Sequence, residues 1–271
     1  MRGCPNNCEF CCATYFSGRK IRYKPIEKVI KEVDGWKTNN VGYLTSANIA
    51  SNFQKAKELF KTLKPYNLKW MGDACVNVVD DNELLNMMSE AGLIYLEVGF
   101  ESLSKDTLLL LNKKQNLKHE YKAVVKKLHD YDISVIGTFM FGADTDDKEV
   151  FKNTMDFVYD SDIDMPIYLL YTPFPGTPPF DRLDAAGRII TKDWSRYNGL
   201  DVVFQPKLMT KEELLQGIIE VWKDALSFKG IAQRLFSRWR GLKSEFYLAV
   251  INLFIKNKSK FLKKHYPWVD I

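Results

Sequence analysis

Short apolar strands alternate with helical segments along much of the chain. The predicted strands are Val41–Ser46, Lys69–Ala74, Ile94–Phe100, Ser134–Phe141 and Pro166–Thr172. Apolar residues at helical spacing lie between them, in Phe53–Leu63, Asp81–Ala91, Lys105–Leu111, Glu120–Tyr131 and Lys148–Tyr159. Strands this apolar, separated by helices, indicate a parallel sheet covered by helices. A strand about every 25–40 residues predicts an α/β fold, a full or partial (β/α) barrel of the TIM type.

The alternation stops near Pro175, in the turn PFPGTPPF. Beyond that turn, residues 211–240 and 244–264 have the apolar spacing of helices. We therefore expect a core barrel over residues 1–190 and a mainly helical C-terminal extension over residues 191–271.

Composition sets limits on the class of protein. Of 271 residues, 46% are hydrophobic and 27% are charged, which is typical of a globular chain and not of a disordered one. A net charge of +5 is too small to indicate nucleic acid, so no nucleic-acid partner is expected. The N-terminus lacks the apolar segment of a signal peptide, and no apolar run reaches the roughly 18 residues of a spanning helix. The sequence therefore predicts a cytoplasmic protein.

Four of the five cysteines lie between residues 4 and 12. This crowding is unsuited to a disulfide framework and favours a metal or redox site in a reducing compartment. Cys4, Cys8 and Cys11 supply three thiolates, the ligands that iron–sulfur clusters require. Three protein ligands on a four-iron cluster leave one iron open. Two alternatives remain: a zinc site, which usually needs four ligands in two separated pairs, and a set of buried structural cysteines.

The segment RGCPNNCEFC resembles the CxxxCxxC signature of the radical S-adenosylmethionine superfamily, including an aromatic residue, Phe10, before the third cysteine. The resemblance implies that Cys4, Cys8 and Cys11 bind a 4Fe–4S cluster. It also implies that the open iron binds S-adenosylmethionine, which is cleaved to a 5′-deoxyadenosyl radical. In such enzymes the cofactor carries the chemistry and the protein positions it.

Three later segments extend the resemblance: LEVGFES, GTFMFGADTDD and LLYTPFPGTPPFDRLDAAGRI. They are similar to the branch that usually carries an N-terminal cobalamin-binding domain, which includes hopanoid and bacteriochlorophyll methylases and cyclases of chlorophyll synthesis. This similarity implies methylation of a lipid or tetrapyrrole-like small molecule, with an electron donor such as flavodoxin or ferredoxin. The usual first strand and the cobalamin domain are missing from these residues. Any cobalamin would therefore be carried by an upstream domain or chain.

The resemblance also implies a binding site for S-adenosylmethionine at the carboxyl ends of the strands, where barrels of this type place function. Glu101 is expected to accept hydrogen bonds from the ribose, and Gly137 and Gly142 to let the backbone approach the adenine. Thr45, Ser46 and Asn48 would seat the methionine amino group in place of the acidic residues of relatives, and Phe10 lies beside the cluster. The alternative for Glu101 is a surface or helix-capping glutamate, and the alternative for Thr45, Ser46 and Asn48 is a plain polar loop. No catalytic residue is predicted beyond the cluster and cofactor site.

Two other functions stay open. One is a cobalamin-independent radical oxidation or rearrangement, and the other is a truncated, non-catalytic iron–sulfur scaffold. The C-terminal stretch Phe246–Ile255 is apolar on nearly all faces and is followed by five lysines. It predicts either a buried terminal helix, which we favour, or a helix lying on an anionic membrane surface.

Overall fold

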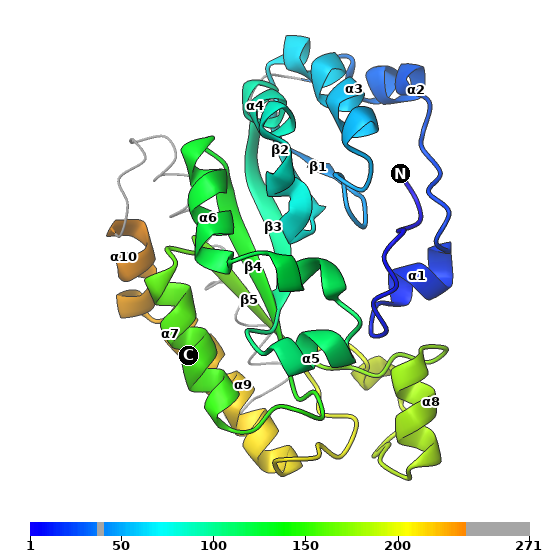
Figure 1. Cartoon of the computed structure of the whole chain (residues 1–271), viewed down its shortest axis with the longest axis vertical. Coiled ribbons are helices and arrows are strands. Elements are labelled where there is room, and N and C mark those ends of the chain that lie inside the picture. Colours follow the sequence, from blue (N-terminus) through cyan, green and yellow to red (C-terminus); the bar gives the residue numbers. More distant parts are fainter. Residues whose placement is uncertain (37–40, 237–271) are drawn as a thin grey trace. The chain divides into compact units, whose positions relative to one another are not determined.

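The structure is a computed structural model that describes residues 1–36 and 41–236. In this part of the chain a sheet of five strands has the order β1-β2-β3-β4-β5 (Figure 1). The strands are β1 Val41–Leu44, β2 Lys69–Ala74, β3 Leu93–Glu101, β4 Ser134–Phe141 and β5 Met165–Leu170. β2 pairs in parallel with both β1 and β3. The described strands form an open sheet, which confirms the prediction of a partial (β/α) barrel.

Helices connect the successive strands, as the apolar spacing predicts. The connecting helices are α3 Phe53–Leu63, α4 Asn82–Glu90, α5 Lys105–Leu110, α6 Tyr121–Asp130 and α7 Glu149–Asp160. The sequence did not predict α1 Cys12–Ser17, α2 Ile26–Val33 or α8 Pro178–Ala185. Up to residue 236, where the described part ends, the pattern predicted over residues 211–240 forms two helices, α9 Lys211–Leu226 and α10 Phe228–Phe236. The described residues also form short 3₁₀ turns, η1 Lys64–Tyr66, η2 Val76–Asp80, η3 Lys114–Lys118 and η4 Trp194–Arg196.

The chain packs as two compact units. Among the described residues, the first unit contains 1–36, 41–100 and 112–137, and the second contains 101–111 and 138–236. This division follows packing, and the boundary expected near residue 190 stays a prediction.

In the first unit the strands carry different residues on their two faces. The side chains of Trp70 and Ala74 on β2 are buried, whereas Met71 and Asp73 between them are half-exposed. Helices α3 and α4 pack side by side (Figure 1). Each helix begins with a side-chain cap. The Asn52 carboxamide oxygen accepts from the Lys55 amide, and Asp81 accepts from the Leu84 amide.

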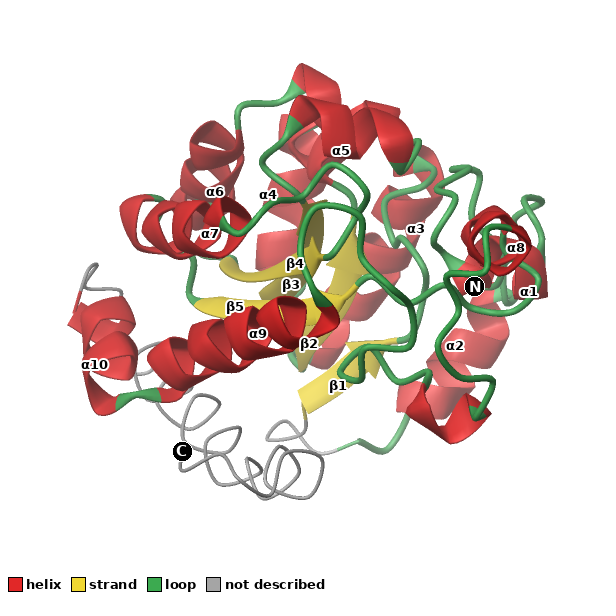
Figure 2. Ribbon diagram, turned by 90° about the horizontal axis from the view of Figure 1, so that it is seen from below, coloured by secondary structure: helices red, strands yellow, loops and turns green. Residues whose placement is uncertain are grey.

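In the second unit, α9 packs against β5 (Figure 2) and also against α7. A capping box starts α9, because Thr210 and Glu213 each accept from the other's backbone amide, at 3.1 and 2.8 Å. Gly217 lies in the middle of this helix. A Cβ at this position would lie 2.2 Å from the Phe151 ring of α7, so the absence of a side chain lets the two helices approach.

Candidate functional site

The cysteine loop runs from Cys4 to Cys11 and leads into α1. The Cys4 and Cys8 side chains are buried, and Cys11 is half-buried. The Cys11 amide donates to the Cys8 carbonyl oxygen at 3.2 Å, which turns the chain between these two cysteines. Gly3 has φ +91°, and a Cβ there would lie 2.4 Å from the Lys20 carbonyl oxygen. Glycine is therefore required for the loop to lie this close to the segment after α1.

A buried cation lies beside these thiols. Burial raises the pKa of both Cys4 and Cys8, and the Lys113 ammonium opposes this effect at each thiol. Lys113 is 5% exposed, and its Nζ lies 5.7 Å from the centroid of the Phe10 ring. A cation favours the thiolate form that a cluster needs.

The donor set suits an iron–sulfur cluster. Cys4, Cys8 and Cys11 lie within eight residues on one loop, which the bond from the Cys11 amide to the Cys8 carbonyl oxygen turns back on itself. Among residues 1–36 and 41–236, no three His, Cys, Asp or Glu side chains are placed to hold one metal ion. A cubane cluster has a different requirement, because each thiolate binds its own iron.

The turn η3 and the residues just before it contact the cysteine loop. The Asn112 carboxamide donates to the Asn7 carbonyl oxygen at 2.7 Å. The Gln115 carboxamide nitrogen lies 3.7 Å from Cys8 Sγ. The sequence prediction missed these residues, because polar side chains in a lysine-rich stretch carry no signal for a contact with a loop more than a hundred residues away.

Buried hydrogen bonds anchor η3 to its neighbours. The Asn116 carboxamide, 1% exposed, donates to the carbonyl oxygens of Gly99 and Phe100 at 3.0 Å each, near the end of β3. His119 contacts a carbonyl oxygen of η3 with one ring nitrogen and the Asp80 carboxylate with the other, at 3.0 and 2.8 Å. Together these contacts hold η3 against the end of β3 and against Asp80 of η2.

Cys75 lies beside the cysteine loop, although it is remote from that loop in sequence. It follows β2 directly and is buried. The Asn6 carboxamide donates to Cys75 Sγ at 3.2 Å, and the Gln115 carboxamide nitrogen lies 3.9 Å from the same sulfur. Cys75 is far from the other four cysteines in sequence, whereas in the structure the Gln115 carboxamide nitrogen lies within hydrogen-bond range of both Cys75 and Cys8.

Thr45 and Ser46 line a cavity of about 440 Å³ in the first unit, together with Tyr23, Lys24 and Ile49 among others. The Ser46 hydroxyl accepts from the Asn48 amide at 3.2 Å. The Asn48 carboxamide oxygen accepts from the backbone amides of Ala50 and Cys75, at 3.1 and 3.4 Å, so Asn48 organises the loop after β1.

One polar group on the half-exposed face of the first three strands was not predicted. The Tyr43 hydroxyl on β1 donates to the Asp73 carboxylate on β2, and it lies 3.5 Å from the Glu97 carboxylate on β3. Asp73 and Glu97 are aligned neighbours in the parallel ladder. Burial raises the pKa of Tyr43, and hydrogen bonding to Asp73 raises it further.

Glu101 ends β3 in a left-handed conformation, with φ +63°. Its side chain is buried. A non-glycine residue in this region of φ and ψ is strained by of order 1 kcal/mol, and such strain is concentrated at functional sites. The predicted ribose contact therefore falls on a residue with an unusual backbone conformation.

Gly137 lies inside β4, which is buried along its whole length, and Gly142 follows that strand with φ +100°. A Cβ on Gly142 would lie 2.8 Å from a methyl carbon of Leu214. Gly137 lies within the predicted strand and Gly142 directly after it, where the backbone conformation favours glycine.

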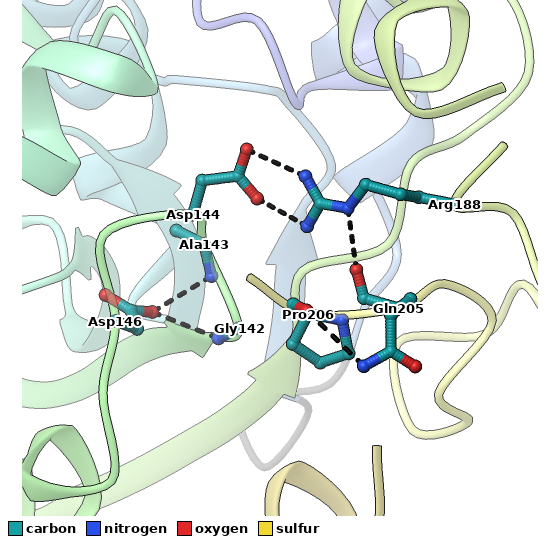
Figure 3. Close-up of polar contacts among 7 residues, drawn as sticks. All are labelled: Gly142, Ala143, Asp144, Asp146, Arg188, Gln205 and Pro206. Atoms are coloured by element: carbon teal, nitrogen blue, oxygen red, sulfur yellow. Dashed lines mark hydrogen bonds and ion pairs between the residues drawn. The ribbon is translucent and has the colours of Figure 1, made fainter. Parts of the chain in front are cut away.

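Two aspartates organise the loop after β4 (Figure 3). Asp146 accepts from the backbone amides of Gly142 and Ala143 through one carboxylate oxygen, at 3.0 Å each. Asp144 points the other way and forms a two-point ion pair with Arg188, at 2.7 and 3.0 Å. Both carboxylates are therefore engaged in contacts within the second unit.

Comparison with known families identifies the chain. The family described as the radical SAM superfamily has a model that matches residues 1–158, more than half of the sequence. The chain belongs to the radical SAM superfamily. The cofactors of this superfamily are a 4Fe–4S cluster and S-adenosylmethionine, and the CxxxCxxC loop lies within the matched region.

Radical SAM relatives with curated names match most of this chain. The bacteriochlorophyllide d C-12(1)-methyltransferase of Chlorobaculum tepidum is 30% identical over 240 residues, which are 86% of this chain and 52% of the relative. The anaerobic magnesium-protoporphyrin IX monomethyl ester cyclase of Cereibacter sphaeroides is 28% identical over 94% of this chain and 42% of the relative. The chain thus spans about half the length of the curated relatives it matches.

A solved radical SAM structure supports the fold. The methyltransferase TsrM from Kitasatospora setae, solved with cobalamin and a 4Fe–4S cluster bound, has a TM-score of 0.59. It is 16% identical, and the match covers 70% of this chain and 37% of TsrM. At this identity the likeness shows the shared architecture only.

The predicted C-terminal helix at Phe246–Ile255 lies outside the described residues, and so does the membrane contact suggested for it. Within residues 1–36 and 41–236, every helix is too short or too polar to cross a membrane.

Proposed function

We propose that this chain is the radical-generating core of an enzyme that methylates a tetrapyrrole-like or lipid substrate. Cys4, Cys8 and Cys11 would hold the 4Fe–4S cluster. When bound, the cluster and S-adenosylmethionine supply the electron and the 5′-deoxyadenosyl radical of this superfamily. The observation that carries the proposal is the cysteine loop itself, with two buried thiols, a buried lysine and an amide donor beside them.

Residues around the loop have separate tasks in this proposal. Lys113 offsets the negative charge of the thiolates, and its contact with Phe10 keeps the ammonium in place. Glu101 would bind the ribose hydroxyls, and the loop residues Thr45 and Ser46 would bind the methionine end. Because Cys4 and Cys8 are buried, they would hold the cluster away from water.

The proposed reaction, methyl transfer, and the proposed class of substrate are based on the names of the relatives. Two of them act on tetrapyrroles by name, and one of these two is a methyltransferase. We include two partners in the proposal. One is a cobalamin-binding domain or chain, since the TsrM structure holds cobalamin, and the other is a small electron donor such as flavodoxin or ferredoxin, since the cluster must be reduced.

Anaerobic reconstitution tests the proposal. The full chain should take up four irons and release 5′-deoxyadenosine from S-adenosylmethionine when it is reduced. Alanine at Cys4, Cys8 or Cys11 should abolish both, and Cys12→Ala should retain both. A full cluster in Cys8→Ala would contradict the ligand assignment.

Labelled methyl groups then test the reaction. Transfer of label from S-adenosylmethionine to bacteriochlorophyllide d, in the presence of a cobalamin protein, would support methylation. The cyclase relative favours radical oxidation as a second candidate. In that case 5′-deoxyadenosine is released and no methyl group is transferred. Absence of both products in a chain with a full cluster would leave an iron–sulfur scaffold.

A further inference from the structure

One amide group links a predicted cluster ligand to Cys75. The Gln115 carboxamide nitrogen lies 3.7 Å from Cys8 Sγ and 3.9 Å from Cys75 Sγ, both within hydrogen-bond range for sulfur. A carboxamide nitrogen carries two N–H groups, so it can donate to each sulfur at once. Gln115 can therefore donate one N–H to Cys8 and the other to Cys75.

A second amide completes a closed ring of contacts. Asn6, inside the cysteine loop, donates to Cys75 Sγ at 3.2 Å. The Cys75 backbone amide donates in turn to the Asn48 carboxamide oxygen at 3.4 Å, which holds the cysteine at the end of β2. The ring thus passes from Cys8 through Gln115, Cys75 and Asn6 back to the same loop.

The ring rests on anchored elements. The residue after Gln115 is the buried Asn116, which is hydrogen-bonded to the end of β3. Cys75 is itself buried. The Gln115 carboxamide is thus held from both sides, so its N–H groups keep their orientation when the charge on a nearby sulfur changes. A donor with a fixed orientation can tune the properties of a bound metal centre.

We propose that Gln115 and Cys75 form an outer sphere of the cluster. Gln115 is a positioning residue that donates to the Cys8 sulfur, and Cys75 anchors the Gln115 and Asn6 amides without binding iron. This inference rests on the assignment of the cluster to the cysteine loop.

The expected effect concerns the reduction potential. Reduction adds an electron to the cluster and makes the thiolate sulfurs more negative. A hydrogen bond to such a sulfur stabilises the reduced state more than the oxidised state, so it raises the potential. Gln115 should therefore make the cluster easier to reduce.

The test is a potential titration of the reconstituted full chain, followed by electron paramagnetic resonance. Gln115→Glu keeps the shape of the side chain but replaces the N–H donors with a carboxylate. Gln115→Leu removes the donors without adding charge. Both variants should bind as much iron as the wild type and have a lower midpoint potential, with the larger shift in the glutamate variant. Gln54→Glu, on the exposed surface of α3, adds the same charge and should leave the potential unchanged.

The outcomes separate the two proposals. A full cluster with an unmoved potential in both Gln115 variants would overturn this inference alone, and so would an equal shift in Gln54→Glu. Cys75→Ala should keep the iron content of the wild type. Loss of iron in Cys75→Ala would make Cys75 a ligand and overturn its outer-sphere role. A wild-type chain that binds no cluster would overturn the cluster assignment and this inference with it.

Discussion

At the scale of the residue, Glu101 combines a strained backbone with a buried carboxylate. The conformation at φ +63° is unfavourable for any residue with a Cβ, so the surrounding structure must stabilise it. A residue that served only as a surface acid would have no need of this position. The strain supports the proposal that the carboxylate is presented to a ligand.

Glu101→Gln tests that role. The change keeps the size of the side chain and removes its charge, so a charge-assisted hydrogen bond to the ribose becomes a neutral one. We expect the affinity for S-adenosylmethionine to fall about ten- to a hundred-fold, or roughly 1.5–3 kcal/mol, while the iron content stays the same. Equilibrium binding to the reconstituted protein measures the change. An unaltered dissociation constant would return Glu101 to a structural role.

Asp146 has a carboxyl group whose pKa is shifted by its environment. Burial raises the pKa of this carboxyl to about 6, although the backbone amides of Gly142 and Ala143 and the Thr107 hydroxyl oppose the shift. Because the folded-state value is the higher one, the folded state binds the proton more tightly. The resulting stabilisation is complete below pH 3.8 and is lost as the pH rises through about 6.

Asp146→Asn should remove this pH dependence. An asparagine oxygen can still accept from the two backbone amides, and its amide can donate to the Thr107 hydroxyl. We expect the free energy of unfolding of the variant, relative to the wild type, to increase by up to about 3 kcal/mol between pH 4 and pH 7. Urea unfolding across this range measures the difference. Asp130→Asn on the exposed face of α6 is the control, and an equal trend there would contradict the assignment.

At the scale of the element, helix propensity and side-chain packing have opposite effects at the contact between α7 and α9. Replacing a mid-helix glycine with alanine normally stabilises a helix by about 1 kcal/mol. At Gly217 the new methyl group would meet the Phe151 ring, which is itself packed against Phe141 with ring centroids 4.9 Å apart.

We expect Gly217→Ala to destabilise the protein by about 1–3 kcal/mol, because overpacking outweighs the gain in helix propensity. Thermal and urea unfolding measure the loss. Gln216→Ala, one residue earlier on the exposed side of α9, is the matched control and should change stability little. If Gly217→Ala were the more stable of the two variants, the close approach of the helices would not be required.

The elements that local pattern determines were predicted well. α3 begins and ends where the apolar spacing placed it, because Asn52 caps its first turn. The predicted helix over residues 211–240 breaks instead at Ser227, whose hydroxyl contacts the Asp224 carbonyl oxygen and the Gly230 amide at 2.7 and 2.9 Å. Apolar spacing continues across this break, so periodicity alone could not reveal it.

The candidate site divides in the same way. Cys4, Cys8 and Cys11 were predicted because their spacing is local and specific. Cys75 and Gln115 were not, since their role depends on contacts between segments 40 residues or more apart. A local pattern in one sequence does not reveal such a long-range contact, because the contact depends on the order of the strands in the sheet.

At the scale of the whole molecule, the sheet has a partly exposed edge. β1 lies at one end of the described strand order, and its Val41 and Tyr43 side chains are 46% and 48% exposed. An apolar edge strand can pair with another chain, and a lysine on such a strand opposes this pairing.

Val41→Lys should therefore reduce self-association of the purified protein at high concentration. Light scattering and gel filtration over a concentration series measure the effect. Leu109→Lys, at an exposed apolar position on α5, adds the same charge away from the edge and should reduce association less. Equal effects would assign the change to net charge and not to the strand.

The ring of contacts around Cys75 also bears on when the site can form during synthesis. The cysteine loop is made first, but Asn6 meets its partner 69 positions later, and Cys8 meets Gln115 only after 107 positions. At roughly 5–20 residues per second, a ribosome needs about 5–20 seconds to supply that second partner. For this interval the Gln115 contact with Cys8 is not yet in place. If iron arrives after η3 has been synthesised, it meets a loop that already has its neighbouring donors in place. If neighbouring cysteines are oxidised to a disulfide before then, they can no longer bind metal.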